Sequence, residues 1–178
     1  MPAAKLVVTL RQRVVIYTHT YRSPAGPIYL AVNRRGAVVR LGYAPIVDLP
    51  DNEEREENKY ACGEVEWQLD RYFAGELEQF DLAVEYEGTG FQRAVWGRLR
   101  KIDYGTTITY GLLAQKIGRR DAAQAVGNAV AANPVAIIMP CHRVIPASGD
   151  IGSYARRTLP DERGSRMKRF LLKLEGAI

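Results

Sequence analysis

Residues 109–132 read TYGLLAQKIGRRDAAQAVGNAVAA and predict two short helices joined by a tight turn. Thr109 can cap a first helix, and Gly118 provides the residue type that commonly ends one. Asp121 can cap a second helix that runs to about Ala132. The spacing is typical of a helix-turn-helix, a compact unit whose second helix enters a groove of DNA.

The second helix of this unit carries no charged side chain. One face can pack inward through Val126, and the opposite face holds Gln124, Gly127 and Asn128. A glycine inside a helix costs about 1 kcal/mol relative to alanine, so Gly127 indicates that another surface approaches closely. That surface is either DNA or, if both faces are buried, another part of the protein.

Charge is distributed unevenly along the 178 residues. Residues 1–88 carry 10 basic and 14 acidic side chains, and residues 89–178 carry 15 basic and 6 acidic ones, giving net charges of −4 and +9. A basic half attracts phosphate and releases counterions from nucleic acid. The alternative is a basic surface that only keeps the protein in solution.

The part of the chain before Gly88 predicts a small sheet followed by one helix. Apolar runs over residues 27–33 and 36–43, with turns before each, predict an antiparallel β-meander that begins near Val14. Residues 48–58 are acidic without apolar periodicity and predict an exposed loop. A helical apolar stripe follows and ends near Gly75.

The part after Gly88 predicts helices joined by short turns. One helix is expected over residues 90–101, before the helix-turn-helix. A last helix, capped near Ser165, is predicted from an inward stripe of Met167, Phe170, Leu171 and Leu174. The fold class is therefore α+β, with a small N-terminal antiparallel β-sheet plus helix domain (residues 1–87) and a mainly helical C-terminal domain (residues 88–178) that contains the helix-turn-helix.

The pentapeptide Pro140-Cys141-His142-Arg143-Val144 is the strongest chemical signal. A free thiol has a pKa of about 8.5 and needs a neighbouring base or positive field to attack as thiolate. Neighbours on a strand or helix point apart, so a relay from Cys141 to His142 needs a water or a sharp bend. The alternative is that Cys141 is a small buried hydrophobic residue and that His142 is a core histidine whose hydrogen bonds are all made within the protein.

Other classes of site are not predicted. The cysteines Cys62 and Cys141 form no disulfide framework, and with His19 and His142 they give no metal-ligand spacing, so we expect no metal and no cofactor. No apolar run reaches membrane-spanning length, and no secretory signal is recognisable. We expect a monomeric cytoplasmic protein, associated with the nucleoid, or nuclear if the source is a eukaryote.

About ninety C-terminal residues resemble, in order, the O6-alkylguanine-DNA alkyltransferase family. The first half resembles the family's N-terminal, ribonuclease-H-like domain more loosely, through residues 23–27 and 72–75. The motifs that carry the C-terminal resemblance are Gly88-Thr89-Gly90-Phe91-Gln92, Val95-Trp96, Tyr104-Gly105, Thr109-Tyr110, Ala125-Val126-Gly127, Asn133-Pro134, residues 140–145, Leu171-Leu172 and Glu175-Gly176.

The resemblance implies direct, irreversible DNA repair. An alkyl group on guanine O6, or on thymine O4, would pass to Cys141, and each molecule would act once. The family relay of cysteine, water, histidine and glutamate falls on Cys141, His142 and Glu175, and Asn133 matches the asparagine that braces the turn before the cysteine. Glu175, next to the inward stripe of the last helix, is either this orienting carboxylate or an ordinary exposed glutamate.

The resemblance also implies that the damaged nucleotide is flipped out of double-stranded DNA through the minor groove. Substrate contacts fall on Tyr110, Val144, Tyr154 and Ala155; the alternative is that the two tyrosines are ordinary half-buried residues without a role in binding. DNA contacts are assigned to five residues: Ala122, Gln124, Gly127, Asn128 and Arg143.

Two departures from the family pattern stand out. Gln124 occupies the position of an arginine that usually fills the gap left by the flipped base, so we expect weaker or slower flipping with unchanged chemistry. Ala155-Arg156-Arg157 replaces a usual glycine pair, and the basic segment over residues 155–167 is longer than in the family. Its arginines could contact phosphates, and they change the pocket rim.

Two other functions compete with repair. A lesion-binding sensor would recognise alkylated guanine without repairing it, but relatives that only bind typically lack the cysteine. A cysteine hydrolase could use Cys141, His142 and Glu175 on an unrelated substrate. The adjacency of cysteine and histidine, together with the uncharged helix, argues against a hydrolase.

Overall fold

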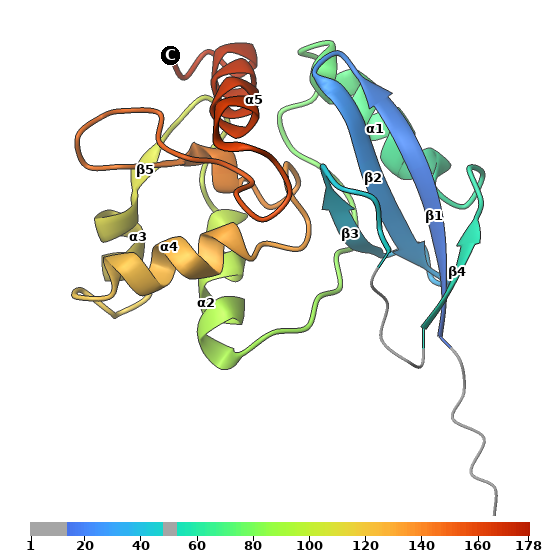
Figure 1. Ribbon diagram of the computed structural model, residues 1–178, viewed down its shortest axis with the longest axis horizontal. Helices are drawn as coiled ribbons and strands as arrows, with labels where there is room; N and C mark the ends of the chain where they lie inside the picture. Colours follow the sequence, from blue (N-terminus) through green and yellow to red (C-terminus); the bar gives the residue numbers. More distant parts are fainter. Residues whose placement is uncertain (1–13, 48–52) are drawn as a thin grey trace, which may run out of the picture.

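The computed structural model describes residues 14–47 and 53–178. A four-stranded sheet with one helix forms the N-terminal half, and short helices form the C-terminal half beside it (Figure 1). The predicted α+β class is confirmed. In the described part of the chain, no helix is both long and apolar enough to cross a membrane.

The first three strands form the predicted antiparallel meander: β1 (Val14–Ser23), β2 (Gly26–Asn33) and β3 (Val38–Gly42). Its turns are held by local hydrogen bonds. The Ser23 hydroxyl donates to the carbonyl of Gly26 over 2.6 Å, and the Asn33 side-chain oxygen accepts two backbone N–H groups from the following turn. Short polar side chains that bond their own backbone favour such turns.

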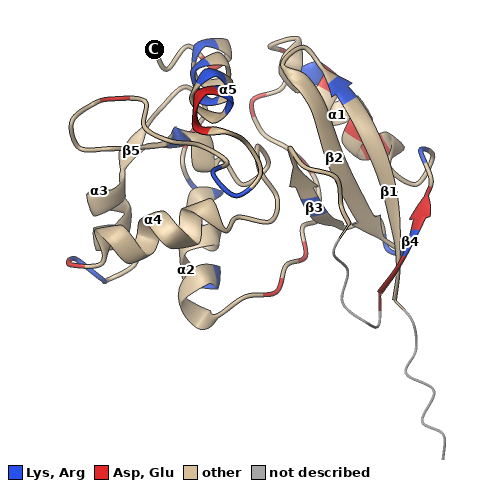
Figure 2. Ribbon diagram, viewed as in Figure 1, with Lys and Arg blue, Asp and Glu red and all other residues tan. Residues whose placement is uncertain are grey.

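The fourth strand corrects the sequence prediction. β4 (Glu53–Glu57) pairs in parallel with β1, so the sheet has the order β3-β2-β1-β4 and is mixed, not purely antiparallel. The predicted loop is therefore wrong for residues 53–57, while residues 48–52 lie outside the described residues. An edge strand bonds on one side only and leaves its side chains mostly exposed, so no apolar period marks it. Its acidic residues, coloured red on the ribbon in Figure 2, discourage further strand pairing.

The predicted helices are all present: α1 (Gly63–Phe73), α2 (Gly90–Leu99), α3 (Tyr110–Lys116), α4 (Ala123–Ala131) and α5 (Asp161–Leu174). The Thr109 hydroxyl caps α3 by accepting the N–H of Leu112 over 3.2 Å, as predicted. Gly118 adopts a positive φ of 72° where the first helix of the helix-turn-helix ends.

Two helix starts differ from the predictions. The N-cap of α4 is Ala122, which makes no side-chain capping bond, so Asp121 is not the cap. The last helix begins after Pro160, four residues before the predicted cap at Ser165. Proline suits a helix start because its φ is fixed and because it has no backbone N–H that would need a partner there. Asp161 and Glu162 complement the positive end of the helix dipole.

The two halves share one continuous apolar core. Strand β3 lies nearest the helical half in Figure 1, and its Leu41 exchanges backbone hydrogen bonds with Pro134 and Ala136 at 2.9 and 2.8 Å. On the far side of this segment, β5 (Ile108–Thr109) pairs in parallel with β6 (Val144–Ile145). The residues between Pro134 and Val144 are thus held by both halves.

Candidate functional site

A cavity of about 1190 Å³ opens between the two halves, and Cys141 lies in its wall. Helices α3 and α4 form one side, the loop between β6 and α5 a second, and the segment that follows β3 a third. Of the residues predicted as functional, eight line this cavity: Tyr110, Gln124, Gly127, Asn128, Asn133, Cys141, Tyr154 and Ala155.

The chain turns sharply just before Cys141. The Asn133 side chain donates to the carbonyl of Met139 over 2.7 Å and accepts the N–H of Val135 over 3.0 Å, which braces the turn. Ile137 adopts a φ of 68°, a strained conformation for a β-branched residue. Cys141 then begins a short 3-10 helix, Cys141–Arg143, in place of a strand or α-helix.

Glu175 gathers a buried hydrogen-bond network behind this turn. Its Oε1 lies 2.7 Å from Nε2 of His142 and 2.7 Å from the Tyr72 hydroxyl, and Arg143 donates to both of its oxygens at 2.8 and 3.0 Å. Glu175 is 5% exposed, so the alternative of an exposed terminal glutamate is excluded. Burial alone would raise the pKa of Glu175, but hydrogen bonds and charges from His142 and Arg143 lower it to about 2.

The contact with Glu175 fixes the proton on His142. Burial lowers the pKa of the imidazole, so the ring is neutral near pH 7. An ionised carboxylate can only accept, so Nε2 carries the proton and donates it to Oε1. Nδ1 is left as the basic nitrogen, and it has no hydrogen-bond partner among the described residues.

Burial is the main influence on Cys141 and raises the pKa of its thiol. Hydrogen bonds from Asn133 and Tyr154 and the positive charge of Lys168 act in the opposite direction. Lys168 is fully buried on α5, donates to the carbonyl of Val144 over 2.6 Å, and has its pKa lowered by burial to about 8. It therefore remains largely charged at pH 7 and favours a thiolate.

The loop that carries Tyr154 is pressed against α5. A Cβ on Gly164 would lie 2.0 Å from the carbonyl oxygen of Tyr154, so only glycine permits this approach. The next residue, Ala155, has a φ of 52°, and it lines the cavity together with the residues that follow it, 156–158. Tyr154 is 4% exposed and thus more deeply buried than the half-buried tyrosine considered above.

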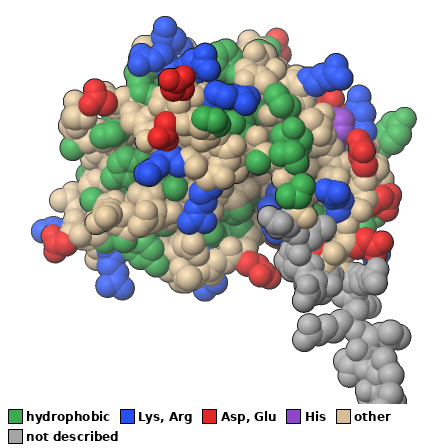
Figure 3. All heavy atoms as spheres, viewed as in Figure 1, with side chains coloured by type: hydrophobic (Ala, Val, Ile, Leu, Met, Phe, Trp, Pro, Cys, Tyr) green, Lys and Arg blue, Asp and Glu red, His purple; other side chains and the backbone are tan. Residues whose placement is uncertain are grey.

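Helix α4 presents the uncharged face that its sequence predicts. Val126, Ala129 and Val130 are buried against the core, whereas Gln124 and Asn128 are exposed. The alternative in which both faces are buried is therefore wrong. In Figure 2 the ribbon of α4 is coloured tan throughout, which marks residues without charge, and the turn before it holds charged residues. Basic and acidic side chains are interspersed over the face in Figure 3, without one large basic surface.

Arg143 was predicted to bind DNA, and its surroundings contradict that role. The side chain is buried, pairs with Glu175, donates to the carbonyl of Ile102 over 2.6 Å and lies over the ring of Tyr104. It is therefore not free to reach a phosphate. Ala122 and Val144 do not line the cavity, and the carbonyl of Val144 already accepts from Lys168.

Three buried residues of the site were not predicted: Tyr43, Tyr72 and Lys168. Tyr72 entered the sequence analysis only through the family resemblance of residues 72–75. Lys168, one position after Met167, interrupts the apolar stripe of α5 and was the only sign of a buried charge. Both cysteines are free. The described ranges contain no group of three or more His, Cys, Asp or Glu side chains that could hold a metal ion.

Two family models match the chain. Residues 16–86 match the ribonuclease-like domain of 6-O-methylguanine DNA methyltransferase, and residues 90–177 match the DNA binding domain of the same family.

Individual relatives cover nearly the whole chain. The methylated-DNA–protein-cysteine methyltransferase of Methanosarcina acetivorans is 44% identical over 164 residues, which cover 91% of this chain and 99% of the relative. A crystal structure of Mycobacterium tuberculosis O6-methylguanine methyltransferase is similar with a TM-score of 0.77 at 39% identity, covering 91% and 93% of the two chains. The crystal structure of Mycobacterium tuberculosis OGT in complex with DNA is similar with a TM-score of 0.76 at 38% identity, covering 92% of this chain and 94% of the relative.

Proposed function

Because the chain belongs to the 6-O-methylguanine DNA methyltransferase family, we propose that it repairs DNA by transferring an alkyl group from guanine O6 to Cys141. The activity is that of a methylated-DNA–protein-cysteine S-methyltransferase. The observation that carries the proposal is the position of Cys141, in the wall of a cavity and next to a histidine whose free nitrogen is basic.

The reaction is a displacement at the alkyl carbon. The Cys141 sulfur forms a bond to that carbon as the bond from carbon to guanine O6 breaks, and the guanine leaves with the electron pair and takes up a proton. The product is a thioether, which no group of the site can cleave, so each molecule acts once. Thymine O4 offers the same kind of alkyl ether and is a second substrate of this proposal.

His142 is the base in this scheme. Its neutral ring, with the proton on Nε2 held by Glu175, offers Nδ1 to the thiol proton through one bridging water. The imidazolium that forms is stabilised by Glu175, whose low pKa keeps the carboxylate ionised. Asn133 and Tyr154 bond the thiolate, and the charge of Lys168 favours it.

DNA is bound as a duplex, with the uncharged face of α4 in the minor groove and the damaged nucleotide flipped into the cavity. Gln124 takes the place of the flipped base, and Ala122, Gly127 and Asn128 adjoin the groove. Tyr110, Tyr154 and Ala155, which line the cavity, surround the guanine. Residues 1–87 and 88–178 are the two domains, the protein acts as a monomer, and it works in the cytoplasm at the nucleoid, or in a nucleus.

The test is intact-protein mass spectrometry after incubation with a duplex that carries one O6-methylguanine. Wild type and Cys62→Ser are expected to gain the mass of one methyl group per molecule, and Cys141→Ser none. Peptide mapping should place the methyl group on Cys141, because Cys62 is buried away from the cavity.

The alternative is a sensor that binds the lesion without repairing it. In that case the wild-type protein binds the duplex tightly and gains no mass, and the relay of Cys141, His142 and Glu175 is disabled. A methyl group found on any residue other than Cys141 would also overturn the proposal.

A further inference from the structure

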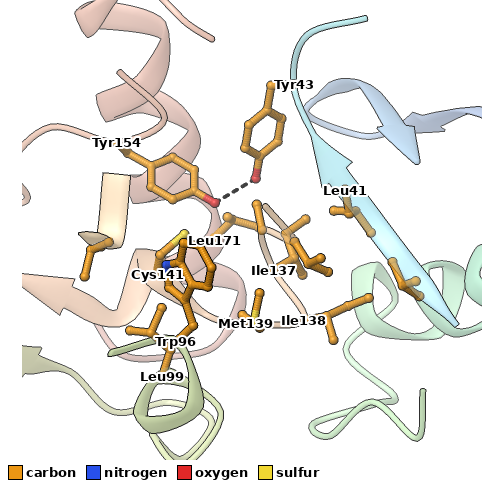
Figure 4. Packing of buried hydrophobic residues seen from close by; sticks show 14 of the residues in the cluster. Leu41, Tyr43, Trp96, Leu99, Ile137, Ile138, Met139, Cys141, Tyr154 and Leu171 are labelled. Atoms are coloured by element: carbon orange, nitrogen blue, oxygen red, sulfur yellow. Dashed lines mark hydrogen bonds between the residues drawn. The ribbon is translucent and has the colours of Figure 1, made fainter. Parts of the chain in front are cut away.

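Two tyrosines from opposite halves of the chain meet at the cavity. Tyr43 follows β3, and Tyr154 lies on the loop between β6 and α5. Their hydroxyl oxygens are 2.9 Å apart, their rings pack edge to face at 5.7 Å, and they are 7% and 4% exposed. Figure 4 shows the two hydroxyls pointing toward each other, with Cys141 below Tyr154.

Backbone contacts fix both tyrosines. Leu41, two residues before Tyr43, exchanges its backbone hydrogen bonds with Pro134 and Ala136, which lead to the cysteine turn. Tyr154 is pressed against Gly164 of α5. The hydrogen bond between the hydroxyls therefore joins two buried side chains whose backbone segments are each held by a neighbouring part of the fold.

We propose that Tyr43 is a positioning residue for alkyl transfer, which acts on Cys141 through the hydroxyl of Tyr154. A phenol has one proton. When Tyr154 donates that proton to the thiolate, its oxygen can only accept, so Tyr43 must donate to Tyr154. Accepting a hydrogen bond makes a hydroxyl a stronger donor, and the bond from Tyr43 also fixes the direction of the Tyr154 hydroxyl.

The electrostatics around the sulfur support a donor role of Tyr154 toward Cys141. Burial is the main reason that the pKa of Cys141 is raised, and the hydrogen bond from Tyr154 is one of the few influences that lower it. The other titratable groups around Cys141 are Tyr110 from α3, Lys168 from α5 and the adjacent His142, backed by Glu175 and Arg143. From the N-terminal half, Tyr43 faces Tyr154 and Tyr72 bonds Glu175.

The inference builds on the proposed function, but its main test does not depend on DNA. The rate of Cys141 modification by iodoacetamide is measured against pH in full-length protein with Cys62→Ser, which gives the apparent pKa of the thiol. Tyr43→Phe is expected to raise that pKa and to slow modification about fivefold at neutral pH, the effect of one neutral hydrogen bond. The difference should vanish at high pH, where every thiol is ionised.

The matched control is Tyr21→Phe. Tyr21 is buried to a similar degree in the N-terminal half, and its hydroxyl donates to Asp70 over 2.8 Å, far from the cavity. This variant should leave the thiol pKa unchanged. A second variant, Tyr154→Phe, removes the same hydrogen bond from the other side and should shift the pKa at least as far.

Combining the variants tests the route. If Tyr43 acts through Tyr154, adding Tyr43→Phe to Tyr154→Phe changes the thiol pKa no further. An unchanged pKa in Tyr43→Phe, or a full additional shift in the double variant, would overturn the inference. Methyl transfer from O6-methylguanine DNA is followed in parallel: its absence in wild type refutes the proposed function and leaves the thiol measurement valid.

Discussion

The hydrogen bonds around Glu175 make one residue responsible for much of the site's order. Three side chains bond the two carboxylate oxygens of Glu175: Tyr72 from α1, and His142 and Arg143 from the 3-10 helix. A buried charge is tolerated when partners surround it in this way, and removing the charge leaves Arg143 without its partner. The network therefore links the protonation of the site to the stability of the fold.

Glu175 should contribute to stability in a pH-dependent way. Its pKa is lowered in the folded protein from 4.5 to about 2, so its contribution is complete above pH 4.5 and is lost as the pH falls toward 2. The full contribution is on the order of 3 kcal/mol. In urea unfolding, the stability advantage of wild type over Glu175→Gln should shrink steadily below pH 4.5. Glu162→Gln, at the exposed start of α5, should show a much smaller trend, because an exposed carboxylate interacts only weakly with the helix dipole. A constant advantage for wild type over Glu175→Gln at all pH values would contradict the prediction.

Among the elements, α4 has the clearest division between stability and function. Its buried face packs on the core, and its exposed face carries no charge. Gly127 lies near the ring of Tyr110, but a Cβ there would be 3.8 Å away, which is an ordinary contact. The protein itself therefore does not require glycine at this position.

Gly127→Ala should stabilise the protein and weaken DNA binding. The helix gains about 1 kcal/mol from the better propensity of alanine, whereas the added methyl group obstructs a DNA backbone that approaches α4. Urea unfolding measures the first effect, and fluorescence anisotropy with a labelled duplex measures the second. Gly97→Ala in α2, where a Cβ meets no atom within 4 Å, should stabilise similarly without a loss of affinity. Equal affinity of Gly127→Ala and wild type would show that DNA does not approach this face.

At the scale of the whole molecule, the two halves are joined by their core and by the site. Tyr72 of the N-terminal half donates to Glu175, Tyr43 bonds Tyr154, and Leu41 pairs with the segment before Cys141. Because these contacts are buried, neither half can unfold without exposing the other's core.

The chain should therefore unfold in a single transition. Each half contains one tryptophan, Trp67 on α1 and Trp96 on α2. In Trp96→Phe the remaining fluorescence of Trp67 reports on the N-terminal half, and in Trp67→Phe that of Trp96 reports on the C-terminal half. Circular dichroism first measures how far each substitution changes the stability of the whole protein. Within each variant, the urea midpoint from tryptophan fluorescence should then equal the midpoint from circular dichroism. Two separated transitions would mean that the halves fold independently.

Local patterns predicted most elements correctly because they depend on neighbours in the sequence. The cap at Thr109 and the turns around Gly26 and Gly36 are made by residues within four positions of each other. Strand β4 was missed because its formation depends on backbone pairing with β1, about forty residues away, and not on its own side chains.

The sequence by itself determined the identity of the reactive groups: a cysteine beside a histidine, an uncharged helix, and motifs that resemble one repair family. Only the tertiary structure decided which charges are buried and what they face. It shows that Arg143 is paired with Glu175 and is not available to bind DNA. It also places Lys168 near the thiol, and Tyr43 and Tyr72 in the site. The physical reason is that burial and hydrogen-bond partners arise from contacts between distant segments, and these control the pKa of a group more strongly than its neighbours in sequence do.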